Sequence, residues 1–231
     1  MKNWGEVNMT KKLFCQAITK FIMGGLLVGV LLFLPAGTFD YWQAWLLMAI
    51  LFIPMFFAGI VMMLKSPELL QKRLNSNERE PEQRQVIALS GIMFLAAFMA
   101  AGLSIRFGWF TLPTWFSYAA AILFLFGYIL YAEVLRENIY LSRTVEVQEN
   151  QKIIDTGLYG IVRHPMYMAT LVLFLSMPLV LGSVFSFVIL LLYIPIIRKR
   201  ILNEEKVLEQ GLKGYVEYEK KVKYRIIPYV W

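Results

Sequence analysis

The stretch MYMATLVLFLSMPLVLGSVFSFVILLLYIPII, residues 166–197, contains no charged side chain in 32 residues. As one α-helix it would be about 48 Å long, because each residue adds about 1.5 Å. The hydrocarbon core of a bilayer is only about 30 Å thick. Pro178, Gly182 and Ser183 are turn-forming residues that divide the run into two pieces of roughly 16 residues. We therefore predict a membrane helical hairpin, whose two ends emerge on the same face of the membrane.

The whole chain has the composition of an integral membrane protein. Of its 231 residues, 58% are hydrophobic and 17% are charged, whereas soluble domains carry about 25% charged residues. Four further apolar runs, each near the length that a membrane-crossing helix needs, precede the hairpin at 20–35, 42–64, 86–107 and 115–133. The expected fold is all-α: a polytopic membrane protein with four transmembrane helices, a C-terminal membrane hairpin and an amphipathic cytoplasmic tail.

The basic residues predict how these segments are oriented. Of the 23 Lys and Arg residues, all except Arg106 lie before the first span, between the second and third spans, in the 134–165 connection, or after Ile197. Since cytoplasmic segments are enriched in Lys and Arg, all four are expected on the cytoplasmic side, with both termini. We expect a multi-pass protein of a prokaryotic inner membrane. The net charge of +7 is then explained by topology, so membrane lipids, and no nucleic acid, are the expected partners.

Two regions are expected to differ in role. Residues 1–133 form the N-terminal membrane helices, and residues 134–231 form the candidate catalytic region, which consists of the connection, the hairpin 166–197 and the tail 198–231. The single Cys15 excludes an internal disulfide and a cysteine-based metal site. No metal is expected.

Arg163-His164-Pro165 lies directly before the charge-free run. Pro165 suits the first turn of a helix, because proline has a fixed φ and no N–H to lose, and this makes His164 the expected cap residue. The unpaired N–H groups of that helix start, together with the charge of Arg163, favour an anion such as a carboxylate. The alternative is a basic collar at the membrane interface with an ordinary helix cap.

Asn203-Glu204-Glu205 places two adjacent carboxylates near an otherwise basic membrane end. Neighbours on a helix point about 100° apart, so one glutamate can face inward while the other pairs with Arg200, Lys206 or solvent. Arg225, near the apolar end of the chain, can pair with such a glutamate or bind a substrate carboxylate through two hydrogen bonds. The alternatives are a solvated helix face and a tail cation on anionic lipid.

Two motifs carry a resemblance to a known family. TGLYGIVRHPMYMA, residues 156–169, and NEEKVLEQGLKGYVEYEKKVKYRIIP, residues 203–228, together resemble the isoprenylcysteine carboxyl methyltransferase family and its prokaryotic relatives. The same region is similar to phospholipid N-methyltransferases. The resemblance implies an all-helical membrane enzyme that binds S-adenosyl-L-methionine in a cytosol-facing pocket closed by the C-terminal segment. It implies methyl transfer to a lipophilic, membrane-resident substrate, with carboxylate O-methylation favoured and amine N-methylation as the other possibility.

Carried over residue by residue, the resemblance implies a set of cofactor-binding residues: Gly157, Leu158, Tyr159, Arg163, His164, Pro165, Tyr167, Glu205, Tyr215 and Tyr218. The carboxylate end of the cofactor is expected near His164 and Tyr167. Catalytic roles fall to Arg225, near the reacting end, and to Glu204 or Glu205. Where the family often has Gly-Pro-Tyr, this chain has Gly157-Leu158-Tyr159, which keeps the glycine and loses a rigid turn.

Two other functions remain as alternatives. The first is a membrane reductase of the sterol-reductase type, which would use NADPH in a similar C-terminal region. The second is a non-enzymatic transporter or scaffold, whose usual sign is ionisable residues inside the spans. The apolar runs here carry almost none after Lys20. The methyl acceptor and the oligomeric state stay open.

Overall fold

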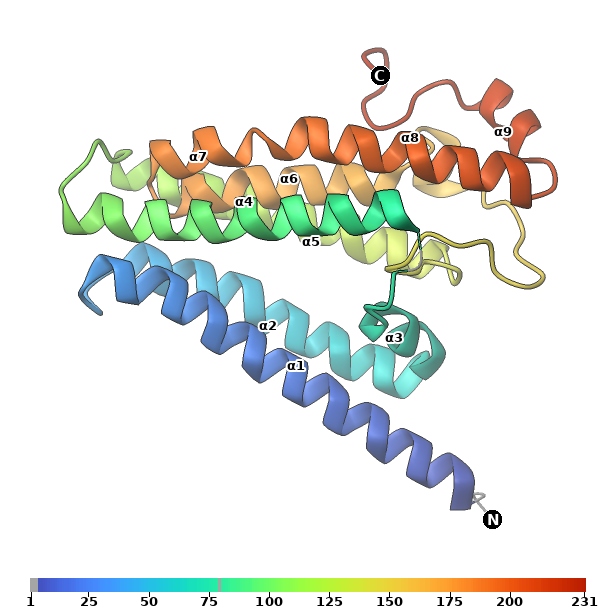
Figure 1. Cartoon of the computed structure of the whole chain (residues 1–231), viewed down its shortest axis with the longest axis horizontal. Coiled ribbons are helices and arrows are strands. Elements are labelled where there is room, and N and C mark those ends of the chain that lie inside the picture. The colour runs from blue at the N-terminus through green and yellow to red at the C-terminus, as the bar shows by residue number, and fades with distance from the viewer. Residues whose placement is uncertain (1–3, 79) are drawn as a thin grey trace.

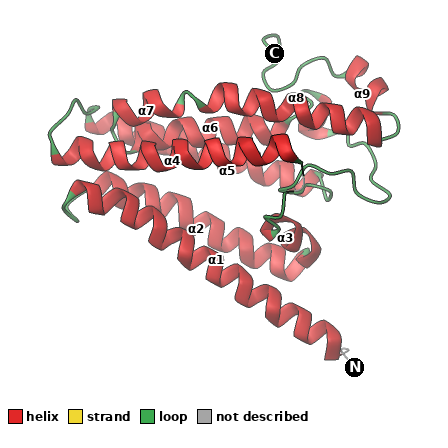
Figure 2. Cartoon of the chain, in the orientation of Figure 1, coloured by secondary structure: helices red, strands yellow, loops and turns green. Residues whose placement is uncertain are grey.

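A computed structural model describes residues 4–78 and 80–231, and within these two ranges every regular element is a helix (Figures 1 and 2). The predicted all-α fold class is confirmed. Lys2 and Arg79, two of the basic residues used to predict the orientation, lie outside the described residues. The elements are α1 (Trp4–Ala36), α2 (Trp42–Lys65), α3 (Pro67–Leu74), α4 (Pro81–Arg106), α5 (Thr114–Glu137), the 3-10 helix η1 (Gly157–Gly160), α6 (Pro165–Val180), α7 (Val184–Leu190), α8 (Tyr193–Gly211) and α9 (Tyr215–Lys221).

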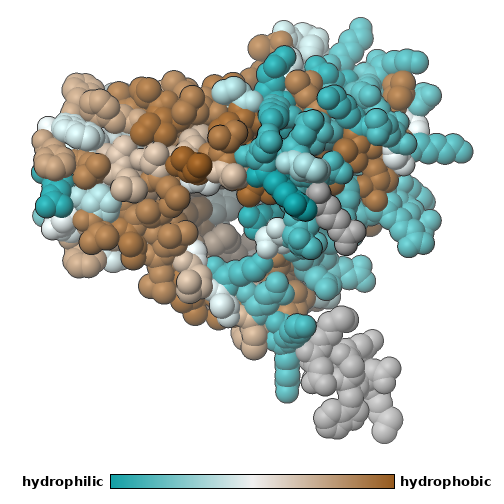
Figure 3. Space-filling model, in the orientation of Figure 1, coloured by the Kyte–Doolittle hydropathy of each residue, from teal (hydrophilic) through white to brown (hydrophobic). Residues whose placement is uncertain are grey.

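Four helices are long and apolar enough to cross a membrane, and they coincide with the four predicted crossings. The spans are Lys11–Ala36, Trp42–Lys65, Pro81–Arg106 and Thr114–Glu137. The protein is therefore a polytopic membrane protein. Hydrophobic side chains cover the end of the molecule where α7 begins, and hydrophilic side chains gather at the opposite end around α3 and α9 (Figure 3). We call this second end the polar end.

The spans pack around a shared apolar core. Leu32 of α1, Leu47 of α2 and Phe124 of α5 are all fully buried in it. Two glycines allow the helices to approach closely. A Cβ atom at Gly102 would lie 2.6 Å from the backbone oxygen of Leu32, and one at Gly127 would lie 2.9 Å from the side chain of Leu173. Small residues at such crossings are typical of membrane helix pairs, where close packing supplies much of the stabilisation.

The chain reverses between α6 and α7 at residues 181–183, inside the predicted hairpin region. Gly182 has a φ of +69°, a conformation that glycine adopts without steric cost. The turn is bound to earlier parts of the chain: the Tyr41 hydroxyl donates to the Leu181 carbonyl at 2.9 Å, and the Leu112 N–H donates to the Gly182 carbonyl at 2.9 Å. The Ser183 hydroxyl lies 3.0 Å from that of Ser104. The first two contacts satisfy backbone carbonyls of the turn, and the third joins the turn to α4.

The return arm of the hairpin differs from the expected single helix of about 16 residues. It consists of α7 and the first turns of α8, separated at Leu191 and Leu192. Pro195 gives the physical reason, because its ring nitrogen cannot donate to the carbonyl of Leu191, four residues earlier, and its ring crowds that carbonyl. α8 then continues beyond the apolar run to Gly211. One 19-residue helix thus carries Glu204 and Glu205 away from the turn at residues 181–183 to the polar end.

Candidate active site

Backbone pairing joins the start of α6 to the C-terminal segment. His164 is the N-cap of α6 and Pro165 its first residue. The Arg163 N–H donates to the Tyr224 carbonyl at 2.9 Å, and the His164 N–H donates to the Arg225 carbonyl at 2.8 Å. Two segments some 60 residues apart in the chain are therefore fixed side by side at the polar end.

The C-terminal segment is itself folded back on its last residue. The backbone N–H groups of Arg225, Ile226 and Ile227 all donate to the carbonyl oxygen of Trp231, at 3.0 to 3.1 Å. The Arg225 guanidinium lies 5.3 Å from the centroid of the Trp231 ring, a cation–π distance. Arg225 is thus held by its backbone and by its side chain.

Glu205 is the centre of a buried ion cluster. Only 3% of the residue is exposed, and its carboxylate lies 2.9 Å from Arg163 Nη2, 3.2 Å from His164 Nε2 and 2.8 Å from Arg225 Nε. Arg163 also reaches Glu219 on α9 at 3.4 Å. One carboxylate on α8 therefore ties together the cap of α6 and the C-terminal segment.

The pKa values of Glu205 and Glu219, the two carboxyl groups of the cluster, are shifted in opposite directions. Burial raises the pKa of Glu205, but hydrogen bonds and charge from His164, with those of Arg225 and Arg163, outweigh it, so the pKa of Glu205 lies below its ordinary value. Burial raises the pKa of Glu219, and the charge of Arg163 offsets this rise only in part. The surrounding cations thus favour the ionised form of Glu205.

Glu204 has a different environment from its neighbour. The Tyr167 hydroxyl donates to Glu204 Oε2, and it accepts from Arg200 Nε at 2.9 Å. Glu204, Tyr167 and Arg200 all line a cavity at the polar end, whereas Glu205 lies outside that lining. The two adjacent glutamates therefore serve different places, Glu204 at the cavity and Glu205 in the ion cluster.

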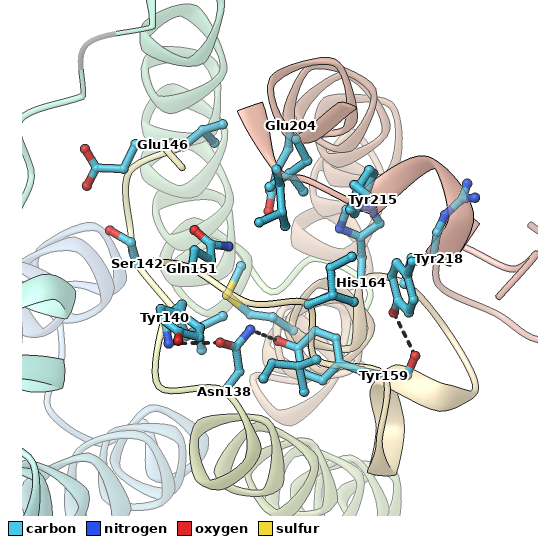
Figure 4. A pocket seen from close by; sticks show the side chains of 18 of the residues that line it. Asn138, Tyr140, Ser142, Glu146, Gln151, Tyr159, His164, Glu204, Tyr215 and Tyr218 are labelled. Carbon is cyan, nitrogen blue, oxygen red and sulfur yellow. Dashed lines mark hydrogen bonds between the residues drawn. The ribbon is translucent and has the colours of Figure 1, made fainter. Parts of the chain in front are cut away.

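The cavity is enclosed by four parts of the chain (Figure 4). These are the 138–154 segment, the start of α6 with η1, α8 from Arg200 onward, and α9. In Figure 4, Glu204 of α8 lies across the cavity from Tyr159 and Asn138. Tyr215 and Tyr218 lie at the right of the view. The Tyr218 hydroxyl donates to the Tyr159 carbonyl at 2.7 Å, which fixes α9 against η1.

The structure separates the predicted site residues into two groups. Those that line the cavity are Tyr159, Arg163, His164, Tyr167, Glu204, Tyr215 and Tyr218. Those outside its lining are Gly157, Leu158, Pro165, Glu205 and Arg225. Gly157, with a φ of +54°, and Pro165 shape the backbone around the cavity. Arg225 contacts Glu205 and Trp231, so the clamp expected from it is directed at the protein's own carboxylate.

Sequence reasoning missed one wall of the cavity. The wall is the 138–154 segment, whose polar lining residues include Asn138, Ser142, Thr144, Glu146 and Gln151. Arg200 was expected only as a partner of one glutamate, and the structure places it in the cavity lining, where it donates to the Tyr167 hydroxyl that contacts Glu204. No periodic pattern marks the 138–154 segment, because it forms no regular element.

Two residues that line the cavity carry a buried donor with no partner among the described residues: the Tyr215 hydroxyl and Arg163 Nε. Buried polar groups are normally hydrogen-bonded, so such donors suit a bound molecule that presents acceptors. Burial also raises the pKa of Tyr215, which keeps its hydroxyl protonated and able to donate. Such donors are complementary to carboxylate and hydroxyl groups. No group of three or more metal-ligating side chains was found in the described ranges.

Comparison with known proteins bears on this region. Residues 115–213 match the phospholipid methyltransferase family. This confirms the methyltransferase resemblance carried by residues 156–169, and the matched phospholipid methyltransferase region contributes α5, the 138–154 segment, α6 and α8 to the molecule.

Two individual proteins are also similar to the chain. The mouse delta(14)-sterol reductase TM7SF2 is 30% identical over 91 residues, which are 38% of this chain and 22% of the reductase. The chain therefore spans less than a quarter of that relative's length. The structure of a eukaryotic intramembrane Ras methyltransferase, isoprenylcysteine carboxyl methyltransferase, aligns with a TM-score of 0.48 and 16% identity, covering 99% of this chain and 88% of that one.

Proposed function

We propose that this protein is a membrane methyltransferase that uses S-adenosyl-L-methionine and acts on a lipophilic, membrane-resident acceptor. The observation that carries the proposal is the cavity of the polar end, because it lies mostly within the matched family region and two of its lining residues carry unpartnered buried donors. We place the cavity and both termini on the cytoplasmic side, which the distribution of basic residues supports.

The cavity residues divide the work of binding. Arg163, with the Tyr215 hydroxyl, donates to the carboxylate end of the cofactor, and His164 lies beside them at the helix start. Tyr159 of η1 and Tyr218 of α9 supply an aromatic wall of the cavity. Glu205 keeps Arg163 in place from behind the cavity. Tyr215 and Tyr218 come from α9, so the C-terminal region closes the cavity and excludes water.

Methyl transfer depends more on the orientation of the acceptor than on acid–base catalysis. When bound, S-adenosyl-L-methionine would supply a methyl group that its sulfonium already activates, so the cavity residues would have to orient the acceptor and exclude water. A carboxylate acceptor is already ionised, and Arg200 supplies positive charge in the lining. An amine acceptor must lose a proton, and Glu204, one of two glutamates in the lining, is the one we assign to accept it. Carboxylate O-methylation is the favoured form of the proposal.

The first experiment is calorimetric titration of the purified protein with S-adenosylhomocysteine. Binding is expected, and no heat of binding at micromolar to millimolar ligand would refute the proposal. NADPH in a parallel titration tests the sterol-reductase alternative, which the 91-residue similarity to the mouse reductase favours. Tight NADPH binding without S-adenosylhomocysteine binding would establish that alternative instead.

The second experiment identifies the acceptor. Cells with and without the gene are fed methionine labelled in its methyl group, and their lipid extracts are compared by mass spectrometry. A base-labile methyl label on a lipid carboxylate would support O-methylation. A base-stable label on an amine would show N-methylation. No gene-dependent label in lipid or lipidated protein would contradict the proposed substrate class.

A further inference from the structure

We infer that Gln83, on the membrane helix α4, is a positioning residue for the cavity: it fixes Arg200, which fixes Tyr167 and through it Glu204. Gln83 lies outside the matched family region and outside the residues 134–231 expected to form the catalytic part. The inference rests on the proposed function, because ligand binding in the cavity is what this positioning serves.

Gln83 is fully buried, and both ends of its amide contact the same partner. Its Nε2 donates to the backbone carbonyl of Arg200 at 3.2 Å, and its Oε1 accepts from Arg200 Nη1 at 3.1 Å. A buried amide is costly when its donor or acceptor lacks a partner. The two contacts therefore hold the main chain and the side chain of Arg200 together.

The guanidinium of Arg200 is held from three directions. Nη1 donates to Gln83 on α4, Nη2 donates to the carbonyl of Arg143 at 2.8 Å, and Nε donates to the Tyr167 hydroxyl at 2.9 Å. The guanidinium is planar, so three partners around it define its position and its orientation. Loss of the Gln83 contact removes the restraint from α4 and lets the plane rotate about the other two.

The orientation of Arg200 sets the direction of the next hydrogen bond. Arginine can only donate, so the Tyr167 hydroxyl accepts from Nε and uses its single hydrogen to donate to Glu204 Oε2. Tyr167 is buried and Glu204 lines the cavity. The series Gln83, Arg200, Tyr167, Glu204 therefore runs from a membrane helix to the cavity wall.

The chain offers a matched control for this contact. Gln85 is also on α4 and also contacts α8, through Lys199 Nζ at 3.1 Å, but the pair is exposed and does not line the cavity. Replacement of Gln85 by Met removes a glutamine contact between the same two helices without touching the series. Any general effect of weakening the α4–α8 contact should therefore appear in both variants.

The test is titration of S-adenosylhomocysteine into the full-length protein and its variants Gln83→Met, Gln85→Met and Tyr167→Phe and the Gln83→Met/Tyr167→Phe double variant. Methionine keeps the approximate volume of glutamine but removes both polar ends. We expect Gln83→Met to bind about tenfold more weakly, from the loss of hydrogen bonds to a charged group, and Gln85→Met to bind like the wild type. In the Tyr167→Phe background, where the series is already interrupted, Gln83→Met should change the affinity by less than about twofold.

Wild-type affinity in Gln83→Met would overturn the inference, and so would an equal loss in both backgrounds, which a merely structural role produces. If Gln83→Met does not fold, Gln83→Glu retains the acceptor for Arg200 Nη1 and should bind within about threefold of the wild type. A tenfold loss in Gln83→Glu with an unchanged unfolding midpoint would also contradict it. Absence of binding by the wild type would instead refute the proposed function, and this inference with it.

Discussion

Replacing Glu204 or Glu205 by glutamine should affect two different properties, ligand binding and stability. Glu205→Gln keeps the shape of the side chain but removes the negative charge that lies among Arg163, His164 and Arg225. Glu204→Gln removes a charge that lines the cavity and contacts the Tyr167 hydroxyl. The first substitution should lower stability, and the second should mainly weaken ligand binding.

The magnitude follows from the burial of Glu205. Breaking a buried ion pair by neutralising one partner costs about 3–5 kcal/mol, because the other charge is left uncompensated. Arg163 is almost fully buried, whereas the Arg225 side chain is 29% exposed and can be solvated in part. We therefore take the lower end, about 3 kcal/mol. For a chain of this size that corresponds to a fall in Tm of about 6–12 °C.

The assay is thermal unfolding of both variants and the wild type in one detergent at a fixed heating rate, since membrane proteins often unfold irreversibly. Glu205→Gln should unfold about 6–12 °C earlier. Glu204→Gln should stay within about 2 °C of the wild type, because its carboxylate is not part of the ion cluster. If Glu205→Gln also unfolded within about 2 °C of the wild type, the ion cluster would not stabilise the fold and our reasoning would be refuted.

Three further predictions follow from the described contacts. The pKa of Glu205 is lower in the folded than in the unfolded state, so the stabilisation that Glu205 provides is complete above the unfolded value of about 4.3 and is lost as the pH falls through the folded value. A wild-type Tm that falls no faster with acid than the Tm of Glu205→Gln would contradict this prediction. Tyr215→Phe removes an unpartnered buried hydroxyl, so it should keep or slightly raise Tm while it weakens S-adenosylhomocysteine binding by about fivefold in titration; unchanged binding would show that this hydroxyl does not meet the ligand. Gly102→Ala brings a methyl group against the backbone of α1 and should destabilise the fold by about 2 kcal/mol in a thermal scan, whereas Gly91→Ala, with no atom within 4 Å of the added Cβ, should be neutral or stabilising. Equal unfolding midpoints of the two variants would show that α1 and α4 can separate at no cost.

Features of the site that are local in sequence could be predicted from it. Pro165 begins α6 and His164 caps it, because the missing N–H of proline marks a helix start wherever the chain folds. The four spans could be predicted for the same reason, since apolar length alone decides them. The break at Leu191 was also readable in principle from Pro195, although the second piece of the charge-free run was expected to be one helix.

Features that depend on the relative placement of helices could not be predicted. Sequence spacing shows that Glu204 and Glu205 point in different directions, but only the rotation of α8 against α6 decides which one meets His164. Arg225 was expected at the reacting end, and its pairing with Glu205 depends on where the C-terminal segment turns back at Trp231. Gln83 carries no sequence signal at all, because its partner is 117 residues away.

The turn of the hairpin has a consequence for the order in which the protein is assembled. Its hydrogen-bond partners Tyr41, Ser104 and Leu112 all precede it in the chain. A ribosome makes them first, so α1 to α5 can already be in the membrane when residues 181–183 leave the exit tunnel. When residues 181–183 fold, the donors and acceptors for this turn are therefore already in place. Synthesis from the N-terminus thus spares the turn a period with unpaired polar groups.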